Sequence, residues 1–216
     1  MKKLIAALAL SCAAFAGVAH AADVGPVMEP KDWFVHVGAA GVFYDPGFNT
    51  PPARLAAFNP GLQLGNNITG VVEAGRYFSD QFSFSIAAGI PPTTDITLTG
   101  VPAAVANPGS VTFGSFILGG QFHFNTEGQI RPYLGAGVAY NVVFSTTPKA
   151  PNAVLNIDNG FGAVLQAGAE ADVAKNVGVF VDVKKMFASA NVTTSIGPSN
   201  AHFNPWIISA GVSFRF

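Results

Sequence analysis

Apolar side chains recur at every second position through eight segments of this chain, and this period of two constrains its fold strongly. From Phe82 to Ile86, large apolar residues alternate with serine, which is the clearest case. Such alternation predicts a β-strand with one apolar face and one polar face. The eight segments span residues 32–44, 67–78, 82–98, 111–124, 130–145, 157–172, 177–193 and 202–216.

The connections between these segments alternate in length. Short polar turns lie at residues 79–81, 125–128 and 174–176, whereas longer loops lie at 45–66, 99–110, 146–156 and 194–201. A barrel that spans an outer membrane has this alternation, because its turns are short on the periplasmic side and its loops are longer outside. A soluble β-sandwich gives no reason for it.

The side chains on the two faces indicate which kind of barrel to expect. Only 11% of the residues are charged, 50% are hydrophobic, and the mean hydropathy is +0.39. One face carries Phe, Leu, Val, Ile and Tyr, whereas the other carries Gly, Ser, Ala and Gln with a few charged residues. Hydrocarbon cannot satisfy backbone N–H and C=O groups, so strands in lipid must close on themselves. We therefore predict an all-β fold, an eight-stranded antiparallel transmembrane β-barrel with short periplasmic turns and longer extracellular loops.

Both ends of the chain carry signals for export and assembly. Lys2 and Lys3, the apolar stretch 4–18 and the Ala-His-Ala run at 19–21 are typical of a secretory signal peptide. We expect residues 1–21 to be removed, 22–31 to form a periplasmic segment, and 32–216 to form a barrel in the outer membrane of a Gram-negative bacterium. The last strand resembles the terminal signal read by the barrel-assembly machinery, with apolar residues at every second position back through Phe214 from Phe216.

Few residues are available for catalysis, metal binding or nucleic-acid binding. The net charge is −1, so the chain has no basic field for nucleic acid. The one cysteine, Cys12, lies in the expected signal peptide. The spacing of His36, His123 and His202 fits neither a Ser-His-acid constellation nor a metal site. We expect no enzymatic activity, no metal and no cofactor.

A set of polar residues falls on the face that we assign to the lumen. Because buried charges need partners, the favoured interpretation is an internal plug of salt bridges and hydrogen bonds; a selectivity filter or a proton-linked site is the alternative. Lys185 falls on the lipid side, where it must either reach the outer interface or mark a break in the wall. The predicted lumen network comprises Glu73, Gln121, His123, Arg131, Gln166, Glu170, Asp182, Lys184 and Arg215.

Aromatic residues near the predicted strand ends suggest girdles at the two membrane interfaces, although packing inside a core is the alternative for each. The residues concerned are Trp33, Phe43, Tyr44, Tyr77, Phe78, Tyr133, Phe144, Trp206 and Phe216.

Four sequence elements together resemble the OmpW family of small outer-membrane barrels, over essentially the whole chain beyond the signal peptide. They are the Arg-Pro-Tyr-Leu-Gly-Ala-Gly-Val run at 131–138, residues 162–168, residues 181–185, and Asn204-Pro205-Trp206 with the terminal phenylalanine. The resemblance implies an eight-stranded barrel that extends beyond the outer leaflet. It also implies a narrow, largely hydrophobic channel that turns sideways through a gap in the wall.

We place the transport path and its gate at Ala87, Met186, Phe180, Pro91 and Pro92. The two prolines cannot donate ladder hydrogen bonds, so strand pairing must fail there, either as a side opening or as an ordinary strand end. The resemblance places bulky gate residues at the positions of Ala87 and Met186. Alanine and methionine would make this constriction looser or more adaptable, if the register is correct.

Three functions are compatible with these expectations. The first is a narrow passive channel for small hydrophobic molecules, with lateral release into the membrane. The second is a structural or adhesive barrel with a closed lumen, and the third is a channel for small amino acids. The expected partners are outer-membrane lipids, lipopolysaccharide, the barrel-assembly machinery and small hydrophobic solutes, and the expected state is a monomer. The apolar segment 52–58 suggests either a short helix or entrance funnel, or a collapsed, buried loop.

Overall fold

A computed structural model describes residues 33–125, 128–150 and 153–216 of the chain. The predicted signal peptide and the predicted periplasmic segment lie outside the described residues. None of the helices in the described ranges has the length and hydrophobicity of a membrane-spanning helix.

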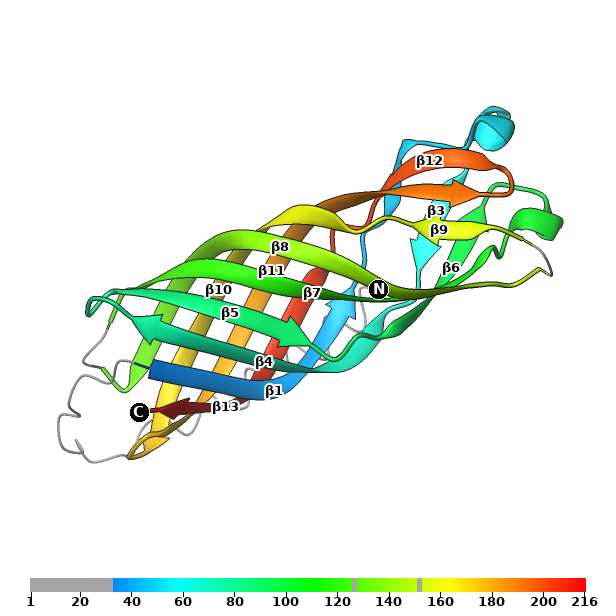
Figure 1. The fold of residues 1–216 in the computed structure, drawn as a ribbon. Helices are drawn as coiled ribbons and strands as arrows, with labels where there is room; N and C mark the ends of the chain where they lie inside the picture. Colours follow the sequence, from blue (N-terminus) through cyan, green and yellow to red (C-terminus); the bar gives the residue numbers. More distant parts are fainter. Residues whose placement is uncertain (1–32, 126–127, 151–152) are drawn as a thin grey trace.

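Thirteen strands and two short 3-10 helices make up this part of the chain (Figure 1). Eight of the strands form the barrel wall and are called the staves below. They are β1 (Trp33–Phe43), β4 (Asn67–Tyr77), β5 (Phe82–Gly89), β7 (Gly109–His123), β8 (Ile130–Pro148), β10 (Gly160–Ala174), β11 (Val177–Thr194) and β13 (Trp206–Arg215). The other elements are β2 (Gly47–Thr50), η1 (Ala53–Phe58), β3 (Gly61–Leu64), β6 (Thr93–Thr99), η2 (Ala103–Val105), β9 (Leu155–Ile157) and β12 (Gly197–His202).

The eight staves form a closed antiparallel barrel. Each stave pairs with its neighbours in the order β1, β4, β5, β7, β8, β10, β11 and β13, and β13 pairs with β1 again. Backbone hydrogen bonds between Trp33 and Phe216, at 3.0 and 3.1 Å, complete the seam at the periplasmic end. Closure leaves these staves without a free edge, which is what hydrocarbon requires. The predicted fold class is confirmed.

The stagger in register between neighbouring strands shows that the strands are tilted relative to the barrel axis. Cross-strand partners followed from Trp33 once around the barrel, through Leu165 and Lys185, return to β1 at Phe43, ten residues further along. For eight strands this stagger corresponds to a tilt of about 40°. The apolar outer wall between Trp33 and Phe43 then covers roughly 25 Å along the barrel axis, the height of an outer-membrane hydrocarbon band.

The two faces of the wall differ as the alternation predicts. Trp33 and Val37 of β1 are 46% and 49% exposed, whereas Phe34 and His36 between them are 0% and 1% exposed. On β5 the outward-facing Phe84 is exposed and the inward-facing Ser83 is buried. Large apolar side chains therefore face outward to lipid, and small and polar side chains fill the interior.

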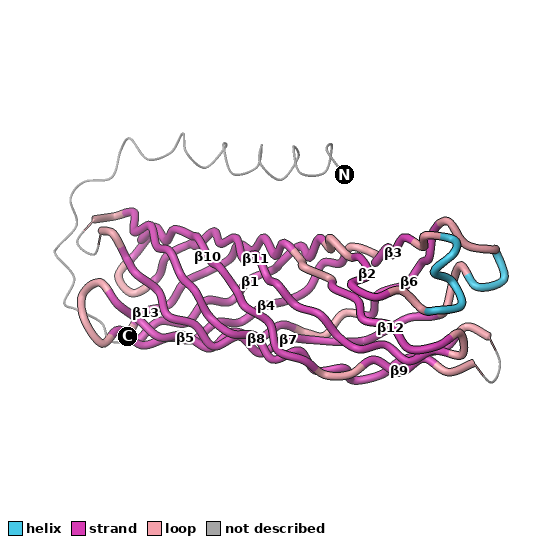
Figure 2. Tube along the Cα trace, turned by 90° about the horizontal axis from the view of Figure 1, so that it is seen from above, coloured by secondary structure: helices cyan, strands magenta, loops and turns pink. Residues whose placement is uncertain are grey.

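The extracellular end is more ordered than predicted. The expected loops 45–66 and 194–201 contain β2, η1, β3 and β12, and β12 pairs with both β11 and β2. Figure 2 shows these elements extending the barrel beyond the staves. The expected strand 82–98 is two strands, because Pro91 and Pro92 interrupt it. Of the alternatives left open for segment 52–58, the structure has the short helix, η1, with Leu55 buried.

The predicted aromatic girdle is only partly present. Trp33, Phe78, Phe144, Trp206 and Phe216 are exposed on the outer wall or at its ends. The prediction is wrong for Tyr44 and Tyr133, which are buried, and for Tyr77, whose hydroxyl is buried. The alternation of side chains explains the correction: Tyr77 and Tyr133 occupy inward-facing positions of β4 and β8, and Tyr44 directly follows β1 and continues its inward-facing positions.

Candidate functional site

The periplasmic third of the lumen is filled by ion pairs around Glu170 on β10. Its Oε1 lies 2.6 Å from Nε2 of His36, and its Oε2 contacts the guanidinium groups of Arg215 and Arg131. Arg131 also forms a two-pronged pair with Asp172. Four strands thus contribute to one buried cluster, which leaves little room for a solute to pass.

A second polar layer lies above the first and is centred on Lys184 of β11. Its Nζ lies 2.9 Å from Oε2 of Glu73 and 2.6 Å from Oδ1 of Asp182. Tyr133 donates to Oδ2 of Asp182 at 2.8 Å, and Gln166 donates to the same atom at 2.7 Å. The two layers together are called the polar plug below.

All nine polar residues predicted for the lumen lie in or beside the polar plug. Eight of them are buried and Arg215 is half-buried. Gln121 joins the second layer by donating to Glu73 at 2.5 Å, and His123 lies 3.1 Å from the hydroxyl of Ser83. Their mutual pairing agrees with the interpretation as a plug, while their functional role stays a prediction.

Sequence reasoning missed three members of the plug, namely His36, Tyr133 and Asp172. Each of the three occupies an inward-facing position of its strand, so the alternation of side chains in the sequence already indicated that it faces the lumen. Tyr133 was assigned to the girdle because of its place near a strand end, and Asp172 was taken for the end of a strand. Only the assembled barrel brings these side chains to Asp182, Glu170 and Arg131.

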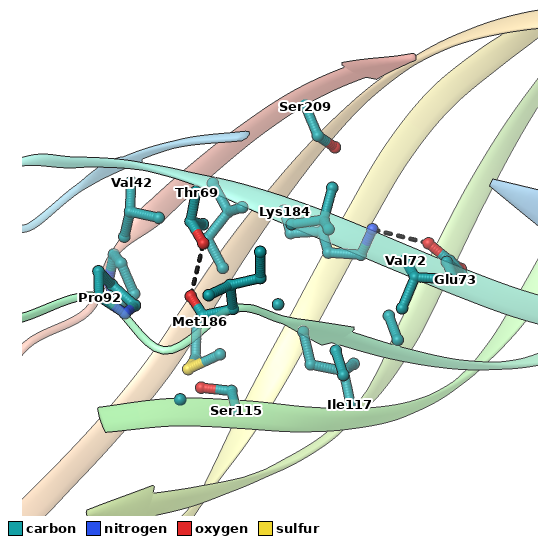
Figure 3. Close-up of a pocket in the computed structure, with 18 of the residues that line it drawn as sticks. Val42, Thr69, Val72, Glu73, Pro92, Ser115, Ile117, Lys184, Met186 and Ser209 are labelled. Atoms are coloured by element: carbon teal, nitrogen blue, oxygen red, sulfur yellow. Dashed lines mark hydrogen bonds and ion pairs between the residues drawn. The ribbon is translucent and has the colours of Figure 1, made fainter. Parts of the chain in front are cut away.

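Above the plug the lumen becomes apolar and opens into a cavity, called the lower cavity (Figure 3). It has an empty volume of about 790 Å³, including the part open to solvent. Ala87, Ile117 and Met186 line its inner wall, and they belong to a packed apolar cluster that also contains Val164 and two alanines. Figure 3 shows the Lys184–Glu73 pair at one end of the cavity and Val42, Thr69 and Pro92 at the other.

A second apolar cavity, called the upper cavity, lies within the extracellular extension. Its empty volume is about 890 Å³, including the part open to solvent, and Leu62, Leu98, Val111 and Leu155 line it with other apolar residues. Phe113 lines both cavities.

Two aromatic rings flank Phe113 at the junction between the cavities. The ring centroid of Phe113 lies 5.6 Å from that of Phe203 and 5.8 Å from that of Tyr44. Phe203 also packs against the cluster that contains Met186. These aromatic residues narrow the lumen where the upper cavity meets the lower one, and sequence reasoning did not single them out for this position.

The barrel wall is interrupted beside the lower cavity. β5 pairs with β7 as far as Ala88 opposite Phe116, and β6 resumes with Thr93 opposite Thr112. Four residues, 89–92, therefore face only three residues of β7, 113–115. The lower cavity is lined here by residues of the outer wall, including the exposed Val72 and Ile90.

Polar contacts hold the interrupted segment in place. The N–H of Ile90 donates to the carbonyl of Gly70 at 2.9 Å, and the hydroxyl of Thr69 donates to the carbonyl of Ile90 at 2.5 Å. On the other side, Pro91 packs over Gly114, where a built Cβ would lie 3.4 Å from the Cβ of Pro91. These few contacts replace the regular ladder that proline cannot form.

The residues predicted for the path and gate gather around the lower cavity. Ala87 and Met186 face inward and are buried in its apolar cluster, so the inward register assumed for them is the one observed. Phe180 lies nearer the plug, stacked on His36 with ring centroids 4.4 Å apart. Pro91 and Pro92 lie in the interruption. A gating role for any of them stays a prediction.

Lys185 lies on the outer wall at a second irregularity, between β12 and β13. Its Nζ donates to the carbonyl of Asn204 at 2.7 Å and lies 4.9 Å from the ring centroid of Trp206. Asn204 has φ of +25°, and the following Pro205 cannot donate to the ladder. The ammonium group thus lies at a break in the wall, and its Nζ also lies 3.8 Å from Oδ2 of Asp45, whose side chain is 79% exposed, so the structure has features of both explanations that the sequence left open.

Comparison with known proteins places these features in a family. The model of the OmpW family matches residues 31–216. An uncharacterized outer-membrane protein, y4mB, from Sinorhizobium fredii is 30% identical over 164 residues, which cover 72% of this chain and 69% of that protein. The dibenzothiophene metabolism operon protein PahQ from Pseudomonas aeruginosa is 23% identical over 87% of this chain and 90% of its own length.

A solved structure has the same fold. The outer membrane protein OprG from Pseudomonas aeruginosa superimposes with a TM-score of 0.75, at 15% identity, over 87% of this chain and 97% of that one. None of the names of these proteins states an enzymatic activity.

Proposed function

This chain belongs to the OmpW family of outer-membrane barrels, and we propose that it is a passive channel that carries small hydrophobic molecules from the cell surface into the outer membrane. The observation that supports this is the pair of apolar cavities in series above a polar plug. Lipopolysaccharide presents a polar barrier to apolar solutes, and an apolar lumen lowers the free energy of crossing it without energy input.

The position of the wall interruption favours release to the side. An apolar solute in the lower cavity has ion pairs beneath it and apolar side chains beside residues 89–92. Displacing the ion pairs would leave buried charges without partners, and the free-energy cost of this is on the order of several kcal/mol. The interruption also lies near the outer edge of the apolar band, where a released solute would meet acyl chains.

The name of one relative agrees with this solute class. PahQ is named for the operon of dibenzothiophene metabolism, and dibenzothiophene is a fused aromatic molecule without charge. We infer a similar class of solute for this chain, namely small, uncharged and largely apolar molecules.

The proposal includes the route by which the chain reaches its membrane. The leader over residues 1–21 is cleaved after export, and the barrel-assembly machinery recognises the end of β13 through Phe214 and Phe216. The barrel then works as a monomer surrounded by phospholipid and lipopolysaccharide. A charged fraction of only 11% agrees with this environment.

A disulfide across the interruption tests the sideways route. The chain beyond residue 21 has no cysteine, so Pro91→Cys with Gly114→Cys introduces an isolated pair at a Cβ separation close to that of natural disulfides. We expect oxidation to slow the uptake of a small hydrocarbon into proteoliposomes severalfold, and a reductant to restore it. The two single-cysteine variants are the controls. Uptake that is equal in the oxidised and reduced double variant would exclude release through this segment.

A structural barrel with a closed lumen is the second candidate, and the polar plug favours it. The same proteoliposomes separate the two functions, because a structural barrel would accelerate hydrocarbon uptake in none of the variants. A channel for small amino acids would need a polar route through the plug, and Lys184→Ala should then increase the uptake of glycine.

A further inference from the structure

The lower cavity is polar at its floor, although most of its wall is apolar. Lys184, Glu73, Ser209 and His36 line the end next to the plug. Ser209 on β13 lies opposite Asp182 on β11, and both side chains are buried on the inward face of the wall. Figure 3 shows Ser209 and Lys184 on the same side of the cavity. A solute that reaches this floor meets hydrogen-bonding groups rather than hydrocarbon.

The floor also has hydrogen-bonding capacity that the plug does not use. Among the described residues, no partner is found for Nδ1 of His36, a side chain that is 1% exposed and belongs to the cavity lining. A buried polar atom without a partner is costly, and a ligand that supplies one relieves the cost. This points to a ligand with a hydrogen-bonding group of its own.

The charge of the floor restricts what that group can be. Lys184 faces two carboxylates, Glu73 and Asp182, so this trio has a formal charge of −1. Below it, Arg131 and Arg215 balance Glu170 and Asp172, and His36 adds no charge when it is counted as a neutral imidazole that donates from Nε2 to Glu170. An incoming carboxylate would lose its hydration and meet excess negative charge, whereas a hydroxyl would lose far less.

We propose that the floor of the lower cavity is a head-group subsite for an uncharged polar group, such as the hydroxyl of a medium-chain alcohol. The alkyl chain of the ligand lies along Ala87, Ile117 and Met186, toward the interruption at 89–92. The channel then favours an alcohol over the alkane of equal length and excludes the corresponding carboxylate. This subsite rests on the proposed function and specifies its solute class.

Methyl NMR of the barrel in lipid nanodiscs tests the subsite independently of uptake. Met186 lines the lower cavity, and its Cε methyl signal is identified by its loss in Met186→Leu. 1-Octanol, octane and sodium octanoate are titrated at matched mole fractions in the bilayer. We expect octanol to shift the Met186 signal at a concentration about three to ten times lower than octane, the range expected for one hydrogen bond. Octanoate should leave the signal unchanged.

Substitutions at Ser209 and at Glu73, each with a second variant beside it, separate the effect of the hydrogen bond from that of the charge. In Ser209→Ala, the concentration of octanol that shifts the Met186 signal should rise close to that of octane. Ser213 is an inward-facing serine on the same strand but outside the cavity, so Ser213→Ala should leave the difference between the two concentrations unchanged. Glu73→Gln removes the excess negative charge and should let octanoate shift the Met186 signal. Asp182→Asn makes the same change of charge and replaces Glu73→Gln if that variant does not fold, as judged by heat-modifiable gel migration.

The results distinguish this subsite from the channel itself. Equal responses to octanol and octane in the parent, or equal effects of Ser209→Ala and Ser213→Ala, would overturn the subsite even while hydrocarbon uptake responds to the disulfide. An octanoate response in the parent as strong as that of octanol would overturn it as well. Conversely, preferential binding of octanol without any accelerated uptake would support the subsite and reject the channel.

Discussion

Lys184 joins two carboxylates in the middle of the barrel, and replacing it tests whether the packed plug stabilises the fold. Its Nζ is within 3 Å of both Glu73 and Asp182, and each of the three side chains is less than one-tenth exposed. In Lys184→Gln much of the side-chain volume is kept, but the formal charge of the trio changes from −1 to −2. The two carboxylates then repel each other in a region that excludes most water.

The size of the effect follows from the burial. Removing one partner of a buried ion pair destabilises a protein by about 3–5 kcal/mol, because the remaining charge is left uncompensated. We expect Lys184→Gln to lower the free energy of unfolding by about this amount, which is more than about a hundredfold in the folding equilibrium. Adding Glu73→Gln returns the charge of the trio to −1, so the double variant should recover at least half of the loss.

Urea titration of the barrel in thin-bilayer vesicles measures these differences, with Trp33 and Trp206 as fluorescent reporters on the outer wall. Refolding and unfolding curves must coincide for the free energies to be valid. A loss below about 1 kcal/mol in Lys184→Gln would refute the reasoning, since the trio would then be solvated or otherwise compensated. A double variant that loses as much as the two single variants together would refute it as well, because the two residues would not interact.

Three further outcomes are expected. A Cβ added in Gly168→Ala would meet the ring of Tyr133 at 2.4 Å, so the free energy of unfolding in the same titration should fall by about 1–3 kcal/mol; an unchanged value would mean that Tyr133 has room to move. Phe203→Ala opens the junction between the cavities and should accelerate hydrocarbon uptake without altering heat-modifiable gel migration, whereas slower uptake would assign the ring to solute binding. Deleting Phe216 removes both backbone hydrogen bonds to Trp33 and should slow folding in a gel-based time course, and an unaffected rate would show that this seam closes late.

Much of the wall could be predicted because its alternation is a local property of each strand. Phe84 and Ser83 differ in which side of the strand they face, and neighbouring residues alone decide this. The same parity places Glu73, Gln166, Glu170 and Lys184 inside. The errors arose where proximity to a strand end was weighed above parity, as for Tyr133, or where two loops pair with each other, as for β2 with β12.

The amino-acid sequence alone therefore determined the class of fold, the face to which each stave directs its side chains, and the position of the break at Pro91 and Pro92. These three properties depend on the alternation of side chains along each strand and on the missing backbone N–H of proline. Both are local, so they can be recognised without knowing which distant residues come into contact. Which polar side chains meet was decided only by the closed barrel, since His36 and Glu170 are 134 residues apart and touch because of the stagger between strands. The aromatic junction of Phe113, Phe203 and Tyr44 likewise exists only after the barrel closes, because three separate strands or loops must reach one level of the lumen.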